Sequence, residues 1–255
     1  METLLLTGTI SPSKDIKKQG YKSTSIKPKE RYFEYINSII YYITQSDFKN
    51  IVFCENSNYN FKDLDLINEL CKLYNKNFEL LQFNGDHKKS LELGYGYGDG
   101  ECMDFAVDNS QVIKSSKNWY KISGRYIIKN INEIIKIFKD KNVYFFKGTN
   151  IDLANFSIAL FSISTYFFKT NSLFYKENLY NIKSNIHLKT SIEFEFYKEL
   201  RFLLDYTNIK SNILLPIENR YYKKFKNINY LGLLDLGFIS YIIDKLLFNF
   251  LHKKS

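Results

Sequence analysis

Hydrophobic and polar positions follow two different periods in the first third of the chain. Short apolar runs bounded by turn residues predict buried β-strands at Thr3–Ile10, Asn50–Cys54 and Phe78–Phe83. Between these runs, apolar residues recur every three or four positions over Glu30–Gln45 and Asp63–Tyr74, which is the spacing of amphipathic helices. Strand, helix, strand, helix and strand in this order predict βαβ units and a mixed, mostly parallel sheet flanked by helices.

The pattern after residue 90 predicts further elements of both kinds. A glycine-rich run, Gly94–Glu101, is expected to form a loop or turn before a helix at Cys102–Lys114. The stretch from Trp119 to Ile135 reads as a strand, a turn and a helix beginning at Asn130 or Asn132. More strands are expected at Val143–Phe146 and Ile213–Pro216, apolar segments lie around 156–168, and helices are expected at Ser172–Asn181 and Ser191–Leu204.

The last segment of the chain differs from the rest in composition. Residues 231–255 form an apolar helical pattern with a basic end, which is the composition of a helix on a membrane interface or of a terminal helix docked on the core. No linker divides the preceding residues. We therefore expect one catalytic domain over residues 1–230 and a C-terminal helical extension over 231–255.

Composition limits the class of protein. Hydrophobic residues make up 45% of the 255 positions, which is enough for a large core, and the net charge of +9 suggests anionic partners. The basic residues do not form a block, so a diffuse basic surface is an equally good explanation. Three cysteines (Cys54, Cys71 and Cys102) fit neither a zinc site nor a disulfide framework, and no secretory signal or membrane span is visible. These features favour the cytoplasm.

Two neighbouring strands of the predicted sheet end in polar residues. Thr7, Gly8 and Thr9 end the first strand, and Glu55 and Asn56 follow the second. Ligands of open α/β sheets lie at the carboxyl ends of the strands, so these residues are candidates for a shared binding crevice. Ordinary strand-to-loop transitions are the alternative.

The glycine-rich run GYGYGDGE matches neither the dinucleotide-binding fingerprint nor the phosphate loop. Its alternating glycines, Gly98 and Gly100 among them, permit close approach of the backbone to a ligand. Asp99 and Glu101 would then cap the following helix. A structural turn with capping and a donor- or acceptor-binding loop both remain open.

A glycine flanked by cations interrupts the pattern at WYKISGRYIIKNINEII. Lys121 and Arg125 stand on either side of Ser123 and Gly124, and a guanidinium is suited to phosphate oxygens. An exposed turn with incidental charges is the alternative. Downstream, Arg220 lies in ENRYYKKFK, which either closes over donor phosphates or is a basic surface loop.

Several of these segments together resemble a known group of proteins. The resemblance covers roughly residues 3–205, and its segments are TLLLTGTI, RYFEYINSIIYYI, NIVFCENS, GYGYGDGE, WYKISGRYIIKNI, FFKTNSLFYKENL and SIEFEFYKEL. The order looks like that of bacterial glycosyltransferase-like proteins found with capsule and lipopolysaccharide genes, whose signature is K-[IL]-[ST]-G-R-[YL]. This resemblance implies a GT-A-like (Rossmann-related) α/β fold and a nucleotide-sugar substrate.

The sequence departs from GT-A enzymes at one place. Where many of them carry an acidic D-x-D motif that holds a divalent metal, this chain has Ser123-Gly124-Arg125. Fixed positive charge can stabilise a leaving phosphate as a metal does, so we expect a metal-independent enzyme without a cofactor. Asp63-Leu64-Asp65 spells D-x-D, but it opens an amphipathic helix and reads as N-terminal capping.

An inverting transfer also needs a general base for the acceptor hydroxyl. The resemblance points to Glu193 in SIEFEFYKEL, with Glu195 as its neighbour on another face of the helix and Glu101 as a third candidate. Solvated helix charge is the alternative for each.

The sequence therefore predicts a glycosyltransferase of bacterial surface-polysaccharide biosynthesis with a glycan or lipid-linked acceptor. It would act in the cytoplasm, at the inner face of the membrane if residues 231–255 bind there as a peripheral helix. In this hypothesis Lys121 and Arg125 hold phosphate, and no nucleic acid is bound. A nucleic-acid-binding protein and an inactive glycosyltransferase-like scaffold are the two rivals.

Overall fold

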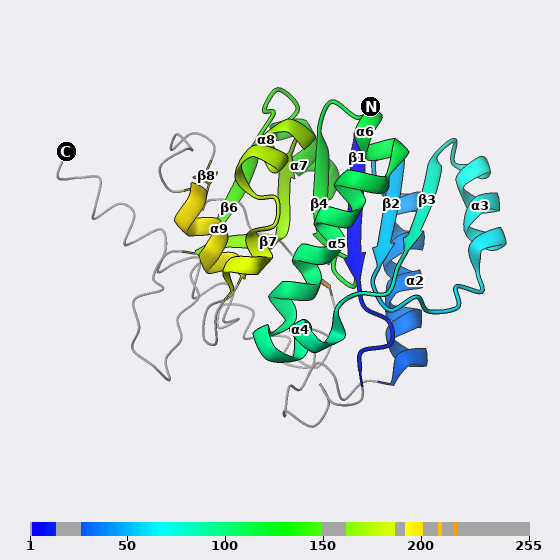
Figure 1. The fold of residues 1–255 in the computed structure, drawn as a ribbon. Helices are drawn as coiled ribbons and strands as arrows, with labels where there is room; N and C mark the ends of the chain where they lie inside the picture. The colour runs from blue at the N-terminus through cyan, green and yellow to red at the C-terminus, as the bar shows by residue number, and fades with distance from the viewer. Residues whose placement is uncertain are drawn as a thin grey trace, which may run out of the picture.

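A seven-stranded sheet forms the centre of the molecule (Figure 1). The computed structural model describes residues 2–13, 27–148, 162–186, 192–200, 209–210 and 217–218. The strand order is β3-β2-β1-β4-β7-β6-β8, in which only β7 runs antiparallel to its neighbours. The strands are β1 (Thr3–Gly8), β2 (Asn50–Glu55), β3 (Asn77–Gln82), β4 (Trp119–Ser123), β6 (Tyr144–Gly148), β7 (Ser162–Thr170) and β8 (Ile209–Lys210). A separate pair joins β5 (Ile127–Ile128) to β9 (Ile217–Glu218).

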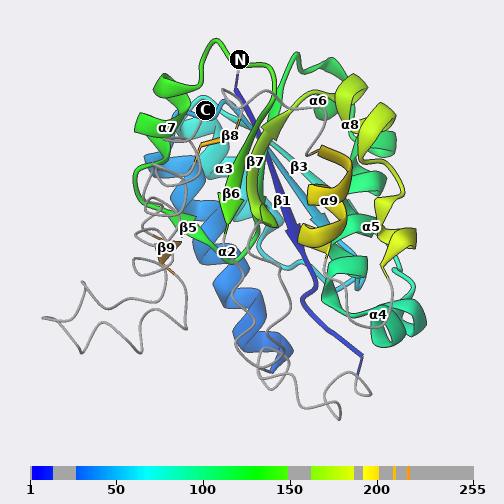
Figure 2. The ribbon, with the colours of Figure 1, turned by 90° about the vertical axis from the view of Figure 1, so that its left-hand side faces the viewer.

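Helices cover both faces of this sheet (Figure 2). One face carries α2 (Pro28–Gln45), α3 (Leu64–Leu73) and α7 (Ile131–Ile137). The opposite face carries α4 (His87–Leu93), α5 (Tyr95–Asn109), α6 (Gln111–Ser115), α8 (Ser172–Asn178), the 3₁₀ helix η2 (Ile182–Asn185) and α9 (Ile192–Leu200). Each layer has its own apolar core against the strands, one containing Ile39 and Ile134 and the other Met103 and Phe196. The alternation of side chains along each strand separates these two cores.

The predicted class, an α/β fold with a mixed and mostly parallel sheet, is confirmed by this arrangement. The first three strands and the first two helices begin and end within two residues of their predicted bounds. The helix expected at Asn130 or Asn132 begins at Ile131 with Asn130 as its N-cap. The predicted strand at Ile213–Pro216, the C-terminal helix over 231–255 and the domain boundary at 230 lie outside the described residues.

The prediction for the glycine-rich run was wrong. Gly96, Gly98 and Gly100 lie inside α5, which begins after Gly94, rather than in a loop before it. A Cβ atom at Gly96 would lie 2.9 Å from the Ile192 side chain, and one at Gly100 would lie 2.8 Å from the Lys183 side chain. The glycines therefore let α9 and η2 approach α5 closely, and this packing offsets the low helix propensity of glycine.

The helix predicted from Cys102 to Lys114 is also divided in two. The division falls at Ser110, whose backbone is extended and whose hydroxyl accepts a hydrogen bond from the amide of Ile113. Asp99 and Glu101 were expected to cap a helix start, but they lie in the second turn of α5, where no free N–H groups remain to be capped.

Candidate functional site

Polar side chains from β1, β4 and α5 meet at the carboxyl edge of the sheet. In the register of these parallel strands Thr7 lies beside Ser123, and Leu5 lies beside Lys121. Side chains alternate along a strand, so Thr7, Lys121 and Ser123 point to the face that α5 covers. This edge is where ligands bind in open α/β sheets.

Asp99 of α5 connects these strands. Its Oδ1 accepts a hydrogen bond from the Thr7 hydroxyl at 2.5 Å, and its Oδ2 accepts one from Lys121 Nζ at 2.5 Å. Lys121 Nζ also donates to Ser123 Oγ at 3.2 Å. We call Thr7, Asp99, Lys121 and Ser123 the edge network. The sequence pattern does not predict this network, because Asp99 is distant in sequence from β1 and β4.

Lys121 contributes to this network as an ion-pair partner. Its side chain has no exposed surface, whereas 23% of the Asp99 side chain is exposed. The ammonium group is thus neutralised and covered, so no contact in the structure supports its predicted role as a direct phosphate ligand. That role stays a prediction.

A second set of contacts links the loops after β1 and β2 to α5. Thr9 donates its hydroxyl to Asn56 Oδ1 at 2.6 Å, and Asn56 Nδ2 donates to the carbonyl of Gly98 at 3.3 Å. Arg31 of α2 donates to the Thr9 carbonyl from Nε at 2.8 Å. Thr9, Asn56 and Gly98, all predicted site residues, therefore lie together, and Arg31 joins them without having been predicted.

Glu55 supports the same loops from within the protein. The carboxylate is fully buried and accepts hydrogen bonds from the amides of Ile10 at 2.9 Å, Ser57 at 2.9 Å and Tyr59 at 3.0 Å. Because its carboxylate oxygens have these hydrogen-bond partners, Glu55 fixes the shape of the loops at the carboxyl edge. Its predicted contact with a nucleotide is untested.

Two glycines allow β1 and β4 to end close together beneath Tyr35. A Cβ atom at Gly8 would lie 2.6 Å from the Tyr35 ring, and one at Gly124 would lie 2.7 Å from the Thr7 carbonyl. The Gly124 amide donates to that carbonyl at 2.8 Å. The backbone at Ser123-Gly124-Arg125 thus extends the pairing of β1 with β4 beyond the end of β4.

Arg125 lies beside this turn and carries partly exposed charge. Its Nη1 donates to Glu34 Oε2 at 3.1 Å, with 20% of each side chain exposed, and its guanidinium lies 6.0 Å from the centre of the Tyr35 ring. Unlike the Lys121 side chain, that of Arg125 is partly exposed at the carboxyl edge. Arg220, the other predicted cation, lies outside the described residues.

Glu101 points away from the edge network. Two positions from Asp99 on the same helix, it faces the loop before α4, where Oε1 accepts the amide of Asp86 at 2.8 Å. Its Oε2 is buried without a hydrogen-bond partner, next to Gly85 and Asn56. These contacts give Glu101 a role in holding the loop, and its catalytic role stays a prediction.

The two glutamates of α9 differ in burial. Glu193 is half-buried in the first turn, and α9 begins at Ile192, which packs against Gly96 of α5. Glu195 is fully buried, and its Oε2 accepts a hydrogen bond from Lys198 Nζ at 2.7 Å. The structure therefore places the start of α9, with Glu193, beside the helix that carries Asp99.

The Cys102 thiol lies 3.7 Å from the Gly8 carbonyl, and burial, together with Cys54, raises its pKa, which disfavours the reactive thiolate. Within the described ranges, no group of three or more His, Cys, Asp or Glu residues is arranged to hold a metal ion.

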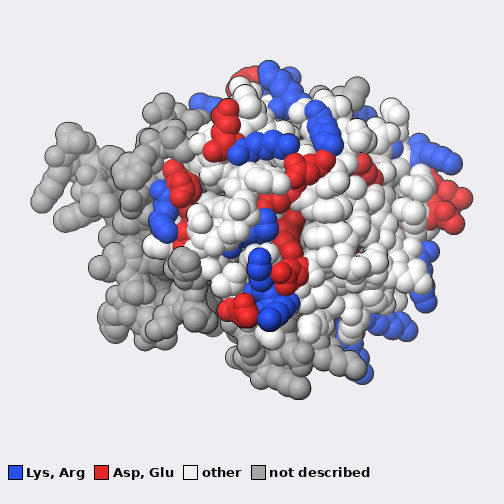
Figure 3. All heavy atoms as spheres, in the orientation of Figure 1, with Lys and Arg blue, Asp and Glu red and all other residues white. Residues whose placement is uncertain are grey.

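The molecular face over α5 carries charges of both signs (Figure 3). Lys183 pairs with Asp104, and Lys176 lies 3.0 Å from Asp108. Burial raises the pKa of the Asp104 carboxyl, and the hydrogen bonds from Lys183 and Tyr175 partly offset this rise. Among the residues that can be described on this face, the lysines are interspersed with carboxylates and form no extended basic patch.

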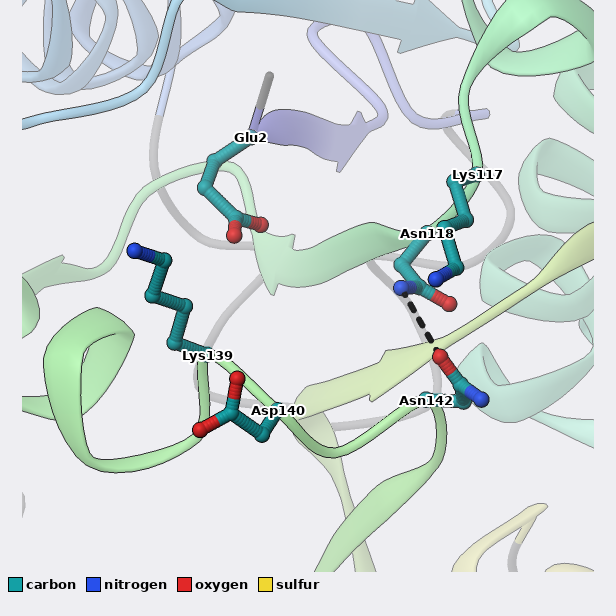
Figure 4. Close-up of a pocket in the computed structure, with 6 residues that line it drawn as sticks. All are labelled: Glu2, Lys117, Asn118, Lys139, Asp140 and Asn142. Atoms are coloured by element: carbon teal, nitrogen blue, oxygen red, sulfur yellow. Dashed lines mark hydrogen bonds between the residues drawn. The ribbon is translucent and has the colours of Figure 1, made fainter.

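A cavity of about 340 Å³ lies at the opposite, amino edge of the sheet (Figure 4). Its lining residues are polar or charged, and they are Glu2, Lys117, Asn118, Lys139, Asp140 and Asn142. Glu2 directly precedes β1, and Asn118 directly precedes β4. None of the predicted site residues lines this cavity.

No helix in the described part of the chain is both long and apolar enough to cross a membrane. A scan against models of protein families and a search of curated proteins find no match.

Similar backbones occur among solved structures of glycosyltransferases. A Desulfovibrio desulfuricans protein assigned as a nucleotide-diphospho-sugar transferase is 12% identical over 79% of this chain and 75% of its own, with a TM-score of 0.43. The glycosyltransferase GlyE of Streptococcus pneumoniae is 8% identical over 91% and 51%, with a TM-score of 0.46. TarS of S. aureus is 12% identical over 77% and 33%, with a TM-score of 0.41.

This chain thus spans about half of GlyE and a third of TarS. At these TM-scores the likenesses carry no argument about function. The chain's own sheet and helices define it as an α/β protein with a polar network at the carboxyl edge.

Proposed function

We propose that the protein is a glycosyltransferase that moves a sugar from a nucleotide-activated donor to a glycan or lipid-linked acceptor. The observation that carries this proposal is the convergence of polar side chains at the carboxyl edge, with Asp99 joined to Thr7 and Lys121 and with Thr9 joined to Asn56. Donors with several hydroxyl groups and a phosphate suit such an edge. The sequence resemblance described above points to the same class.

Each part of the edge has a role in the proposed reaction. Thr9 and Asn56 line the nucleotide pocket on loops that Glu55 holds, and Gly8 and Gly124 let the strand ends approach it. Arg125 contacts the donor phosphate, because its side chain is partly exposed beside the turn that follows β4. Gly100 keeps α5 close to α9, and Gly98 lets Asn56 approach α5, so that these glycines shape the place where donor and acceptor would meet.

The transfer would break the bond between the sugar's anomeric carbon and the phosphate oxygen. The acceptor hydroxyl attacks the anomeric carbon, Glu193 takes the hydroxyl proton, and the nucleotide leaves with the bonding electron pair. Arg125 would stabilise the negative charge that develops on the leaving phosphate. We propose that fixed positive charge performs this role without a divalent metal.

A role in bacterial surface-polysaccharide assembly, on the cytoplasmic face of the membrane, follows from the resemblance. In this proposal residues 231–255 reach the membrane and Arg220 closes over the phosphates.

A panel of nucleotide sugars tests the proposed function. UDP-glucose, GDP-mannose, dTDP-glucose and CMP-N-acetylneuraminate are each titrated into the protein, with the unfolding midpoint as the readout. We expect one nucleotide family to raise the midpoint, because a ligand at 100 times its Kd stabilises the folded state by about 2.7 kcal/mol. A chelator should leave turnover of that donor unchanged.

The same panel separates the rivals. Binding of a donor without turnover in the presence of any acceptor tested would favour an inactive scaffold. If no nucleotide sugar binds and an oligonucleotide binds with steep salt dependence, the protein binds nucleic acid instead.

A further inference from the structure

The edge network turns a carboxylate, and not an ammonium, toward the site. Lys121 and Asp99 form an ion pair in which the lysine side chain is completely covered and the aspartate side chain is 23% exposed. A ligand that approaches this part of the edge therefore meets the Asp99 carboxylate first.

This carboxylate is held in one orientation. Thr7 and Lys121 each donate one hydrogen bond to it, at 2.5 Å, and hydrogen bonds to charged groups are the stronger kind. The helix that carries it is also fixed, because Gly96 and Gly100 allow α9 and η2 to pack directly on its backbone. Asp99 is therefore pre-organised before any ligand binds.

The chemistry of a carboxylate defines its ligand group. An ionised carboxylate has about four lone-pair positions and only accepts hydrogen bonds, and two of its positions here are taken by Thr7 and Lys121. The remaining positions can accept from a hydroxyl or an amine, whereas a phosphate, which carries negative charge, would be repelled.

We propose that Asp99 binds a hydroxyl group of the donor, on its transferred sugar or its ribose, and that Lys121 is the residue that positions Asp99. This inference rests on the proposed function and changes the role predicted for Lys121, from a phosphate ligand to the support of a hydroxyl-binding carboxylate. The donor phosphate then lies away from Asp99, toward Arg125.

The test compares the wild-type protein with the double variant Asp99→Asn/Lys121→Gln. The double variant removes both charges and keeps similar shapes, so that no unpaired buried charge is left behind. Isothermal titration measures the affinity of each for the donor found in the panel and for its free nucleotide. Lys169→Met is the matched control, since Lys169 is equally buried but its ammonium group donates to the carbonyls of Phe138 and Lys139.

We expect the double variant to bind the donor on the order of 10- to 100-fold more weakly, the usual loss for a hydrogen bond to a charged group. A loss for the donor but not for the free nucleotide assigns the hydroxyl to the sugar, and an equal loss for both assigns it to the ribose. The control variant should bind both as the wild type does.

A second arm needs no variant. Donor analogues that lack single hydroxyl groups, on the ribose or on the sugar, are titrated into the wild-type protein, and one of them should lose the same 10- to 100-fold. Unchanged affinity of the double variant, or equal binding of all deoxy analogues, would overturn the inference while leaving the proposed function standing. If no nucleotide sugar binds the wild-type protein, the proposed function itself fails.

Discussion

Among the side chains of the central sheet that the structure describes, two lysines are completely buried, and the molecule satisfies their charges in different ways. Lys121 of β4 faces α5 and pairs with the Asp99 carboxylate. Lys169 of the neighbouring β7 donates to the carbonyls of Phe138 at 2.8 Å and Lys139 at 3.3 Å, where α7 ends.

The Lys169 arrangement shows that this fold can bury an ammonium group whose hydrogen bonds go to carbonyls, while the carboxylates of Glu2 and Asp140 act on it only through their charge. Carbonyl groups at a helix C-terminus carry partial negative charge, and the ring of Tyr120 lies 5.1 Å away. Burial still lowers the pKa of Lys169. The carboxylate beside Lys121 is therefore an added feature of the carboxyl edge, where function is expected, and not a general requirement of burial.

The largest expected effect on catalysis is at Arg125, whose side chain, unlike those of the two lysines, is partly exposed at the carboxyl edge. Arg125→Ala should lower kcat with the identified donor by roughly 10²- to 10³-fold, because a charge that stabilises the leaving phosphate is lost. The variant should unfold cooperatively with a midpoint near that of the wild type. Wild-type kinetics in Arg125→Ala would contradict the phosphate role.

Lys121→Met should lower the free energy of unfolding, measured in urea, by about 3 kcal/mol. This value is at the lower end of the range for a broken buried ion pair, because 23% of the Asp99 side chain is exposed to water. Adding Asp99→Asn should restore part of that loss. An unfolding curve of Lys121→Met that overlays the wild type would show that the pair contributes nothing.

Lys169→Met should cost about 2 kcal/mol, since it leaves two buried carbonyls at the end of α7 without their donor. Donor affinity, measured by titration, should not change. A tenfold loss of donor affinity in Lys169→Met would show that Lys169 also supports the binding site, and that its role is not structural alone.

Gly100→Ala tests the packing that brings Asp99 to Lys121. The added Cβ would lie 2.8 Å from the Lys183 side chain, so overpacking should exceed the helix propensity gained, with a net loss of about 1 kcal/mol. Thermal unfolding measures this. A more stable Gly100→Ala protein would mean that α5 and η2 are not in close contact.

The smallest effect concerns Lys76, which repeats the arrangement of Lys169. Its Nζ donates to the carbonyls of Tyr42 at 2.8 Å and Ser46 at 2.6 Å, at the end of α2, and burial lowers its pKa to about 8. In the unfolded chain the pKa is about 10.4, so between these values the unfolded state binds more protons and stability rises with pH.

Urea unfolding at pH 8 and pH 9.5 measures this slope. Unfolded tyrosines and cysteines also ionise in this range, but they contribute equally to the wild type and the variant, so the difference between the two slopes reports on Lys76. In Lys76→Met the free energy of unfolding should rise less with pH than in the wild type. Lys72→Met, on the exposed surface of α3, is the control and should keep the wild-type slope. Identical slopes for wild type and Lys76→Met would contradict the shifted pKa.

Much of the fold could be predicted because its signals are local. The apolar runs of β1, β2 and β3 and the three-to-four spacing of α2 and α3 reflect burial of strands and helix faces, which is written in consecutive residues. The antiparallel direction of β7 could not be predicted, since an apolar run carries no sign of its direction.

The site was predicted less completely, because its contacts join residues distant in sequence. Polar strand ends identified Thr7, Thr9 and Asn56, and these do lie at one edge. The role of Asp99 depends on α5 being a helix despite its glycines, and that depends on Ile192 and Lys183 packing against it. The local sequence around Lys121 therefore carries no sign of its ion pair with Asp99.

Hydrogen–deuterium exchange with and without the bound donor tests the central claim most directly, because it reports on both edges of the sheet at once. The account predicts protection at the carboxyl edge, in the segments around Thr7–Ser11, Glu55–Ser57, Gly98–Glu101 and Ser123–Arg125, with unchanged exchange around Lys117–Asn118 and Lys139–Asn142 at the amino-edge cavity. Protection confined to the amino-edge segments, or found in neither place, would contradict it.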